Sequence, residues 1–259
     1  MKISATIITF NEEKQIKRCL DSLAGVVDEI VVVDSYSTDQ TEDICSSFKQ
    51  VRFIQNKFGG FIEQKNFAVG VAKYDWILSL DGDECLSEEL IEELQQLKQA
   101  DSDGSQAFSM PRLNRYCGRW IRHSGWYPDR KVRLWRKAVG KWGGRNPHDS
   151  VVLEKEMKAK MLKSDILHYT IPTLEAHVAQ SNKFSEIAAN ELLKSPRRKP
   201  AVFKMIFNPP FVFFKKYFFQ LGFLDGFHGL SIAVVSAHSK FLKYAKYIQL
   251  RSDNENSTP

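Results

Sequence analysis

Two hydrophobic periods alternate along the first hundred residues, and this alternation constrains the fold more than any other feature. Short β-branched and aliphatic runs, typical of strands buried in a parallel sheet, occur at 3–10, 29–33, 51–54 and 74–80. Apolar residues at helical spacing follow them at 12–24, 38–48, 61–72 and 87–97. Four strand–helix units in succession predict an open α/β sheet with helices on both faces.

The pattern loosens after residue 107, where Trp, Arg and Gly connect further strands. Residues 150–153 and 158–162 are consistent with a hairpin, 174–193 with a helix capped by Thr173, and 229–250 with a last helix. We therefore expect three parts. Residues 1–170 form the main α/β domain, with halves at 1–100 and 101–170, followed by a helical extension at 171–250 and a disordered tail at 251–259.

Polar residues end three strands of the predicted sheet, at Thr9–Glu12, Asp34–Ser35 and Asp81–Glu84. Open α/β sheets bind ligands beyond the carboxyl ends of their strands. Asp81 and Asp83 repel each other unless a cation lies between them, and hard carboxylate oxygens suit Mg²⁺ or Mn²⁺ bound to phosphate. The alternative for Asp81-Gly82 is an ordinary turn, and Asp34 could merely accompany the cap of the next helix. No glycine-rich phosphate loop occurs, so a nucleotide would depend on the metal and these strand ends.

The charge is divided unevenly along the chain. Residues 1–100 carry 10 Lys or Arg and 18 Asp or Glu, whereas residues 101–259 carry 27 and 13. The positive part suggests an anionic partner. Four scattered cysteines favour a reducing compartment, and no apolar run reaches the roughly 18 to 20 residues that cross a bilayer. We expect a cytoplasmic protein that does not span a membrane.

Four motifs in order give the chain a family resemblance. They are TIITFNEE at 6–13, VVVDSYSTDQT at 31–41, QKN at 64–66 and LDGDE at 80–84, and together they resemble family 2 glycosyltransferases of the GT-A fold. Later segments resemble one branch, the lipopolysaccharide core β-glucosyltransferases: RLWR at 133–136, GGRNPHD at 143–149, LHY at 167–169 and GFLDG at 222–226. The resemblance covers nearly the whole chain to about residue 250.

This resemblance implies an inverting, metal-dependent transfer of a hexose, most simply glucose from UDP-glucose, to the lipopolysaccharide inner core. The donor would be bound by residues from the strand ends and the QKN motif: Thr9, Phe10, Asn11, Glu12, Asp34, Lys65, Asn66 and Asp81. Asp83 would be the main metal ligand, with Asp81 beside it. Transferases that make polyprenyl-phosphate sugars or other polysaccharides share these motifs, and a non-catalytic anionic glycolipid-binding module is the alternative from another class.

The resemblance also places the catalytic base on the acceptor side. An inverting transfer needs a carboxylate that removes the acceptor proton. Asp149 of the His-Asp pair is the first choice, and Asp129 is the runner-up because it is the only acid between residues 111 and 145. We expect the acceptor to contact residues of the same basic region: Arg133, Arg145, His148 and Trp126.

Two further segments bear on the acceptor. Arg and Lys interleaved with Trp at 112–145 suit nucleic acid, phosphorylated glycolipid or a solvated loop; the motifs favour glycolipid over nucleic acid. Nine of the eighteen Phe lie at 203–227, and five of them follow helical spacing. Such a stripe is either ordinary core or an interfacial helix pair on anionic lipid. We expect peripheral attachment to the inner membrane, where a lipid-anchored acceptor is presented.

Overall fold

The computed structural model describes residues 1–100, 104–145, 148–194 and 200–256, and the chain divides into two compact units. The first unit comprises residues 1–113 and 128–169, and the second comprises residues 114–127 and 170–259. The second unit therefore includes residues 114–127, which were expected in the α/β domain. They belong there because, for example, Cys117 N donates to Ile171 O at 2.8 Å.

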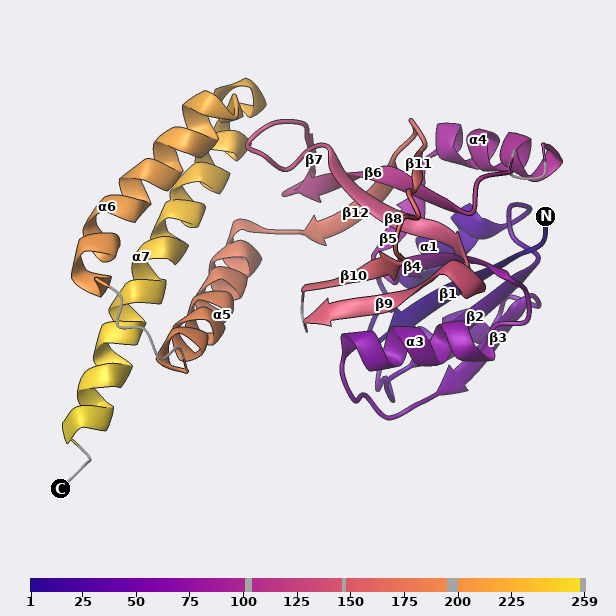
Figure 1. The fold of residues 1–259 in the computed structure, drawn as a ribbon, viewed down its shortest axis with the longest axis horizontal. Helices are drawn as coiled ribbons and strands as arrows, with labels where there is room; N and C mark the ends of the chain where they lie inside the picture. The colour runs from indigo at the N-terminus through magenta and orange to yellow at the C-terminus, as the bar shows by residue number, and fades with distance from the viewer. Residues whose placement is uncertain (101–103, 146–147, 195–199, 257–259) are drawn as a thin grey trace. The chain divides into compact units, whose positions relative to one another are not determined.

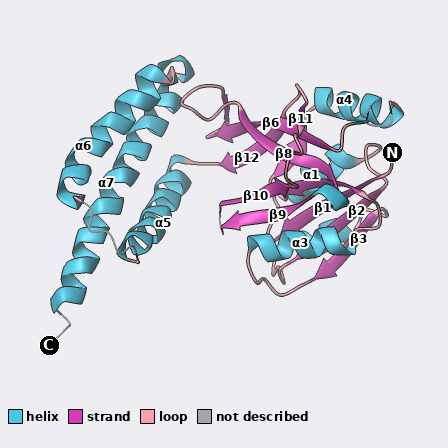
Figure 2. Cartoon of the chain, viewed as in Figure 1, coloured by secondary structure: helices cyan, strands magenta, loops and turns pink. Residues whose placement is uncertain are grey.

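The elements follow the predicted alternation through the first hundred residues (Figures 1 and 2). The strands are β1 (Ile3–Thr9), β2 (Glu29–Asp34), β3 (Val51–Gln55), β4 (Trp76–Asp81), β5 (Glu84–Leu86), β6 (Ala107–Tyr116), β7 (Arg119–Ile121), β8 (Asp129–Arg136), β9 (Gly140–Arg145), β10 (His148–Leu153), β11 (Lys160–Met161) and β12 (Ile166–Ile171). The helices are α1 (Ile16–Leu23), α2 (Thr41–Ser46), α3 (Phe61–Val71), α4 (Glu88–Gln99), α5 (Leu174–Leu193), α6 (Ala201–Phe214) and α7 (Phe227–Asn256).

The main sheet has the strand order β3-β2-β1-β4-β8-β6-β12-β5. The first four strands are parallel, and β8 runs antiparallel to β4. Because β2 lies on one side of β1 and β4 on the other, the strand order reverses here, and a crevice opens beyond the carboxyl ends of β1 and β4. The predicted GT-A architecture, an open mixed sheet with a C-terminal helical region, is confirmed.

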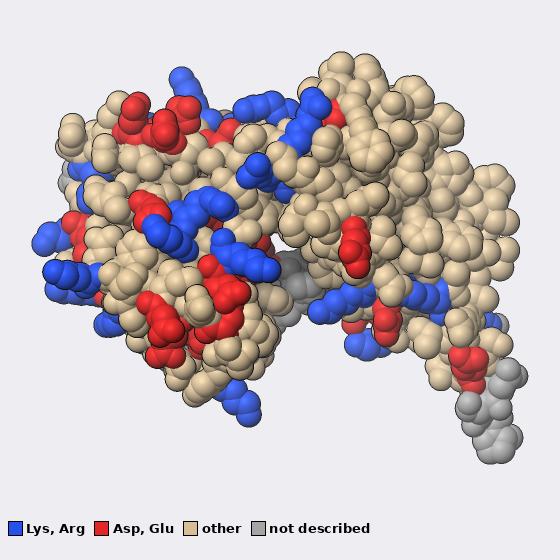
Figure 3. All heavy atoms as spheres, turned by 180° about the vertical axis from the view of Figure 1, so that it is seen from behind, with Lys and Arg blue, Asp and Glu red and all other residues tan. Residues whose placement is uncertain are grey.

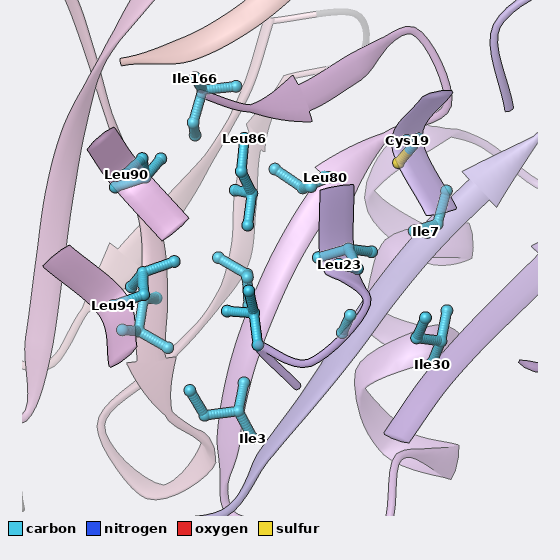
Figure 4. Packing of buried hydrophobic residues seen from close by; sticks show 14 of the residues in the cluster. Ile3, Ile7, Cys19, Leu23, Ile30, Leu80, Leu86, Leu90, Leu94 and Ile166 are labelled. Carbon is cyan, nitrogen blue, oxygen red and sulfur yellow. The ribbon is translucent and has the colours of Figure 1, made fainter. Parts of the chain in front are cut away.

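Apolar side chains that alternate along the strands bury both faces of this sheet. Ile30 and Val32 of β2 pack in one cluster with α1 and α4, whereas Val31 and Val33 pack on the other face with α3. Figure 4 shows Leu90 and Leu94 of α4 beside the strand residues of the first cluster. Two fully buried faces explain why the strands read as continuous apolar runs.

The predicted hairpin of 150–153 with 158–162 is wrong. Residues 148–153 form β10, which pairs antiparallel with β9, while β11 pairs parallel with β6. Both segments have strand character, but their partners lie earlier in the chain.

The second unit contains α5, α6 and α7. The predicted cap of α5 is confirmed, since Ala176 N donates to Thr173 Oγ1 at 3.1 Å. Helix α7 continues to Asn256, so residues 251–256 are helical rather than part of the expected tail, and 257–259 lie outside the described residues. In the described ranges, no helix combines the length and the apolar character needed to cross a membrane.

Candidate active site

A cavity of about 1090 Å³ opens in the first unit at the carboxyl ends of β1 and β4. Seven of the residues predicted for donor, metal or base line it, together with the predicted acceptor residue Arg133: Thr9, Phe10, Glu12, Lys65, Asp81, Asp83 and Asp149. These side chains come from five separate segments of the chain. The structure therefore brings most of the predicted charged residues into a single site, whereas Asp34 and Asp129 are not among the residues that line it.

Lys65 lies between two of the predicted carboxylates. Its Nζ is 2.8 Å from Asp81 Oδ1 and 2.8 Å from Asp149 Oδ2, and it lies 4.2 Å from the centre of the Trp142 ring. Arg133 Nη2 donates to the other oxygen of Asp81 at 3.1 Å. Burial alone would raise the pKa of Asp81, but the charges of Arg133 and Lys65 hold it well below its usual range. Asp81 is therefore an anion fixed by two cations.

Glu84 belongs to the same network of charges, and its place in the sequence alone predicts no role for it. Its carboxylate is fully buried and accepts from Arg112 Nη1 at 3.0 Å and from Arg133 Nη2 at 2.8 Å. Its second oxygen accepts from Asp81 N at 3.0 Å. Glu84 thus fixes both the turn that carries Asp81 and the arginines beside it. The local signals for this residue are its place in the LDGDE motif and at the start of an apolar strand, and neither indicates a buried ion-pair network.

We expect Glu84→Gln to lower the free energy of unfolding by about 3 kcal/mol, because it removes one partner of buried ion pairs. Arg112 and Arg133 keep Asp129 and Asp81 as second partners, which places the loss at the low end for such changes. Urea unfolding measures it, with the exposed Glu92→Gln on α4 as control. Equal stability of the two variants would show that the network does not depend on the Glu84 charge.

Acidic side chains crowd around the turn at Asp81–Asp83. Burial first, and then the charges of Asp83, Asp39 and Asp81, raise the pKa of Glu12 to about 7. The turn passes close to Glu12, since a Cβ at Gly82 would approach Glu12 Cγ to 3.1 Å. His168 Nε2, from β12, lies 3.1 Å from Asp83 Oδ2. Mutual repulsion of these acids would be relieved by a cation.

Asp81, Asp83 and His168 could hold a divalent cation if the substrate supplies the remaining ligands of that cation. Among the described residues, no group of three or more His, Cys, Asp or Glu is arranged to hold a metal by itself. Mg²⁺ sites commonly use one or two carboxylates and take their remaining ligands from phosphate and water. Asp83, with Asp81 and His168 next to it, matches that pattern. His168 is a site residue whose LHY motif is part of the family resemblance but predicts no role for it.

Three residues predicted to bind the donor are not among the residues that line the cavity, and they make internal hydrogen bonds instead. Asp34, fully buried, accepts from Thr9 Oγ1 at 2.9 Å and from Ser37 N at 2.7 Å. Asn11 Oδ1 accepts from Thr38 N at 2.8 Å. Asn66 holds β9, since its Nδ2 donates to Trp142 O at 2.9 Å and its Oδ1 accepts from Trp142 N at 3.0 Å. Their donor contacts stay predictions.

The two candidate bases differ in their surroundings. Asp149, on β10, lines the cavity. Asp129 is not among the lining residues; it is paired with Arg112 Nη2 at 2.7 Å and with Lys131 Nζ at 3.0 Å. Burial raises the pKa of Asp129, but Arg112 and Lys131 lower it overall. The geometry therefore favours Asp149.

The predicted acceptor residues are only partly described. Arg133 lines the cavity, and Arg112, Arg130 and Lys131 add further positive charge to it. Arg145 and His148 lie on β9 and β10, but their side chains are outside the described part of the chain. Trp126 belongs to the second unit, where its ring packs edge-on against Tyr116, 5.6 Å between centres.

Comparison with known proteins identifies relatives of this chain. A model of glycosyl transferase family 2 matches residues 4–155. A glycosyltransferase of Rickettsia bellii is 33% identical over 267 residues, which span 96% of this chain and 87% of the relative. The lipopolysaccharide core biosynthesis glycosyltransferase LpsC of Rhizobium meliloti is 30% identical over 261 residues, spanning 96% and 93%. Among solved structures, residues 1–349 of S. aureus TarS in complex with UDP-GlcNAc align with a TM-score of 0.49 at 16% identity, covering 98% of this chain and 92% of that fragment.

Proposed function

Because this chain belongs to glycosyl transferase family 2, we propose that it is an inverting, metal-dependent hexosyltransferase. The donor would be a UDP-sugar, most simply UDP-glucose, and the acceptor the inner core of a lipopolysaccharide. The observation that carries this proposal is the convergence of Asp81, Asp83 and Asp149 on a single cavity at the strand-order reversal. The similarity to LpsC supports the acceptor class.

The two sides of the reaction can be assigned to different residues of the cavity. Asp149 would accept the proton of the acceptor hydroxyl while that oxygen bonds to C1 of the sugar. The bond from C1 to the phosphate oxygen breaks on the opposite face, and its electron pair leaves with UDP. Inversion at C1 follows from this single displacement. Lys65 holds the Asp149 carboxylate in place through the 2.8 Å contact.

On the donor side, Asp83 would be the main protein ligand of Mg²⁺ or Mn²⁺, with Asp81 and His168 beside it. When bound, the cation would neutralise the negative charge that grows on the leaving diphosphate. Thr9, Phe10 and Glu12 at the end of β1 would contact the nucleoside. Arg112, Arg130 and Lys131 would attract the anionic substrates into the cavity.

We expect UDP-glucose with Mn²⁺ to raise the melting temperature by about 5 °C at a concentration about 100-fold above Kd. Slow release of UDP should accompany it, with water in the acceptor position. Excess EDTA should abolish both effects, and GDP-mannose serves as the control donor. If no UDP-sugar binds or turns over in the presence of Mn²⁺, the transferase proposal is wrong.

A lipopolysaccharide acceptor is anchored in a membrane, so the enzyme would act at the cytoplasmic face of the inner membrane as a peripheral protein. This location is part of the proposal. It requires a surface that binds lipid.

A further inference from the structure

The Phe stripe of α6 is exposed. Its five members continue from α6 into the π-helical turn Lys215–Phe219. Their exposed fractions are 60%, 54%, 66%, 53% and 49% for Phe203, Phe207, Phe211, Phe214 and Phe218. The interpretation of this stripe as ordinary core is therefore wrong. Side chains of this size are normally buried, and a contiguous exposed set marks an interaction surface.

The opposite face of α6 supplies the packing against α7. Asn208 Nδ2 donates to Tyr244 Oη at 3.3 Å, and Met205 packs on the cluster that contains Tyr244 and Tyr247. The stripe is thus the outer face of a helical hairpin, and the inner face of α6 is already packed against α7.

The turn between the two helices displays more apolar side chains. Phe219 is 82% exposed and Phe227 70% exposed, and Leu221, Phe223 and Leu224 between them are also exposed. The turn itself is firmly built: a Cβ at Gly229 would meet Gly222 O at 1.8 Å, and the buried Asp225 accepts from His123 N at 2.9 Å. A rigid turn therefore exposes these five apolar side chains, which we call the tip of the hairpin: Phe219, Leu221, Phe223, Leu224 and Phe227.

From residue 200 to residue 250 the surface charge of the hairpin is positive, whereas the last turns of α7 carry Asp253 and Glu255. Residues 200–250 contain six lysines and one acid, Asp225, which is buried. Lys215 and Lys216 lie just before the turn, and Lys240 lies about midway along α7. The charges of Lys215 and Lys240 add to the effect of burial in lowering the pKa of Lys216. In Figure 3 a broad area of the second unit carries neither Lys and Arg nor Asp and Glu. The hairpin combines a wide apolar face with a lysine cluster.

These features select an anionic lipid surface over a second copy of the chain. Two copies that met through this face would bring their lysines together, because apart from the buried Asp225 the carboxylates of the hairpin, Asp253 and Glu255, lie at the far end of α7 from the turn. An anionic bilayer instead offers an apolar interior for the aromatic side chains and phosphates for the lysines.

We propose that the α6–α7 hairpin is a membrane-docking device. Its Phe stripe and tip would insert at the boundary between headgroups and acyl chains, and Lys215 and Lys240 would contact lipid phosphates. This inference extends the proposed function, since it places the enzyme where a lipid-anchored acceptor is found. Vesicle binding needs no donor, so the two proposals fail separately.

The test is flotation of the purified protein with phosphatidylcholine vesicles with and without phosphatidylglycerol. We expect binding to the anionic vesicles at low salt, weakened by high salt. Phe219→Ser and Phe227→Ser should each lower the partition coefficient about tenfold. Lys215→Gln and Lys240→Gln should each lower it about fivefold. Phe67→Ser, on the exposed side of α3 in the first unit, is the matched control and should bind like the parent protein.

Turnover of UDP-glucose should be unchanged in the Phe219 and Phe227 variants, which confirms that they fold. Failure of the parent protein to float with anionic vesicles would overturn the docking proposal. So would sedimentation that shows a dimer which these same substitutions dissociate. Vesicle binding without any donor turnover would support docking and count against the transferase alone.

Discussion

Replacing Asp83 by alanine is expected to lower the rate of UDP release from UDP-glucose by about a thousandfold. Asp83 is the carboxylate of the 81–83 turn with no lysine or arginine among its hydrogen-bond and ion-pair partners in the described structure; its contact is His168. Asp81, in contrast, is held by Lys65 and Arg133. Asp83 is therefore the carboxylate of this turn that can bind a cation, and its loss would remove the part of the diphosphate charge compensation that the cation supplies.

The matched control is Asp75→Ala, a surface aspartate of the same unit that pairs with Arg136. It should leave turnover within twofold of the parent protein, an order-of-magnitude expectation for surface substitutions. Titration with Mn²⁺ gives a second readout, because the Asp83 variant should require far more metal. Full turnover by the Asp83 variant at the same Mn²⁺ concentration would remove this residue from the metal site.

Much of the site follows from local sequence because parallel strands fix the position of their own carboxyl ends. Thr9 lies beside Asp34 and Ile8 beside Asp81 in the register of the sheet. Recognising strands at 3–10, 29–33 and 74–80 was therefore enough to predict that these strand-end residues meet. Alternating burial on two faces made those strands readable as apolar runs.

The remaining residues of the site depend on partners that are distant in sequence. Glu84, Arg112 and His168 stand on β5, β6 and β12, and no short-range pattern indicates that these strands meet. The same reason explains why the predicted hairpin of 150–153 with 158–162 is wrong, because the sequence of a strand does not indicate which strand it pairs with.

Periodicity also leaves open which face of a helix is buried. The Phe spacing on α6 predicts one apolar side correctly. Whether that side meets α7 or solvent is decided by α7, whose Tyr244 and Tyr247 take the other face. Helical spacing predicts the Phe stripe, and tertiary packing decides whether the stripe is buried or exposed.

The last prediction concerns the base. Asp149→Asn is expected to lower kcat about a thousandfold with KM for UDP-glucose nearly unchanged, because general-base catalysis contributes on that order and the donor does not depend on this carboxylate. The amide oxygen of asparagine can still accept from Lys65, so the 2.8 Å contact and the position of Asp81 should persist. The thermal shift with UDP-glucose and Mn²⁺ should therefore stay the same while turnover falls.

Asp129→Asn separates the two candidates, because Asp129 carries the same chemistry but is paired with Arg112 and Lys131 beside the cavity. It should keep kcat within about threefold, with only a small loss of stability from a partly exposed pair. The opposite result, an active Asp149 variant and an inactive Asp129 variant, would reassign the base to Asp129. That outcome would further mean that the ion pair between Arg112 and Asp129 opens when substrate binds, while Arg112 keeps its contact with the buried Glu84.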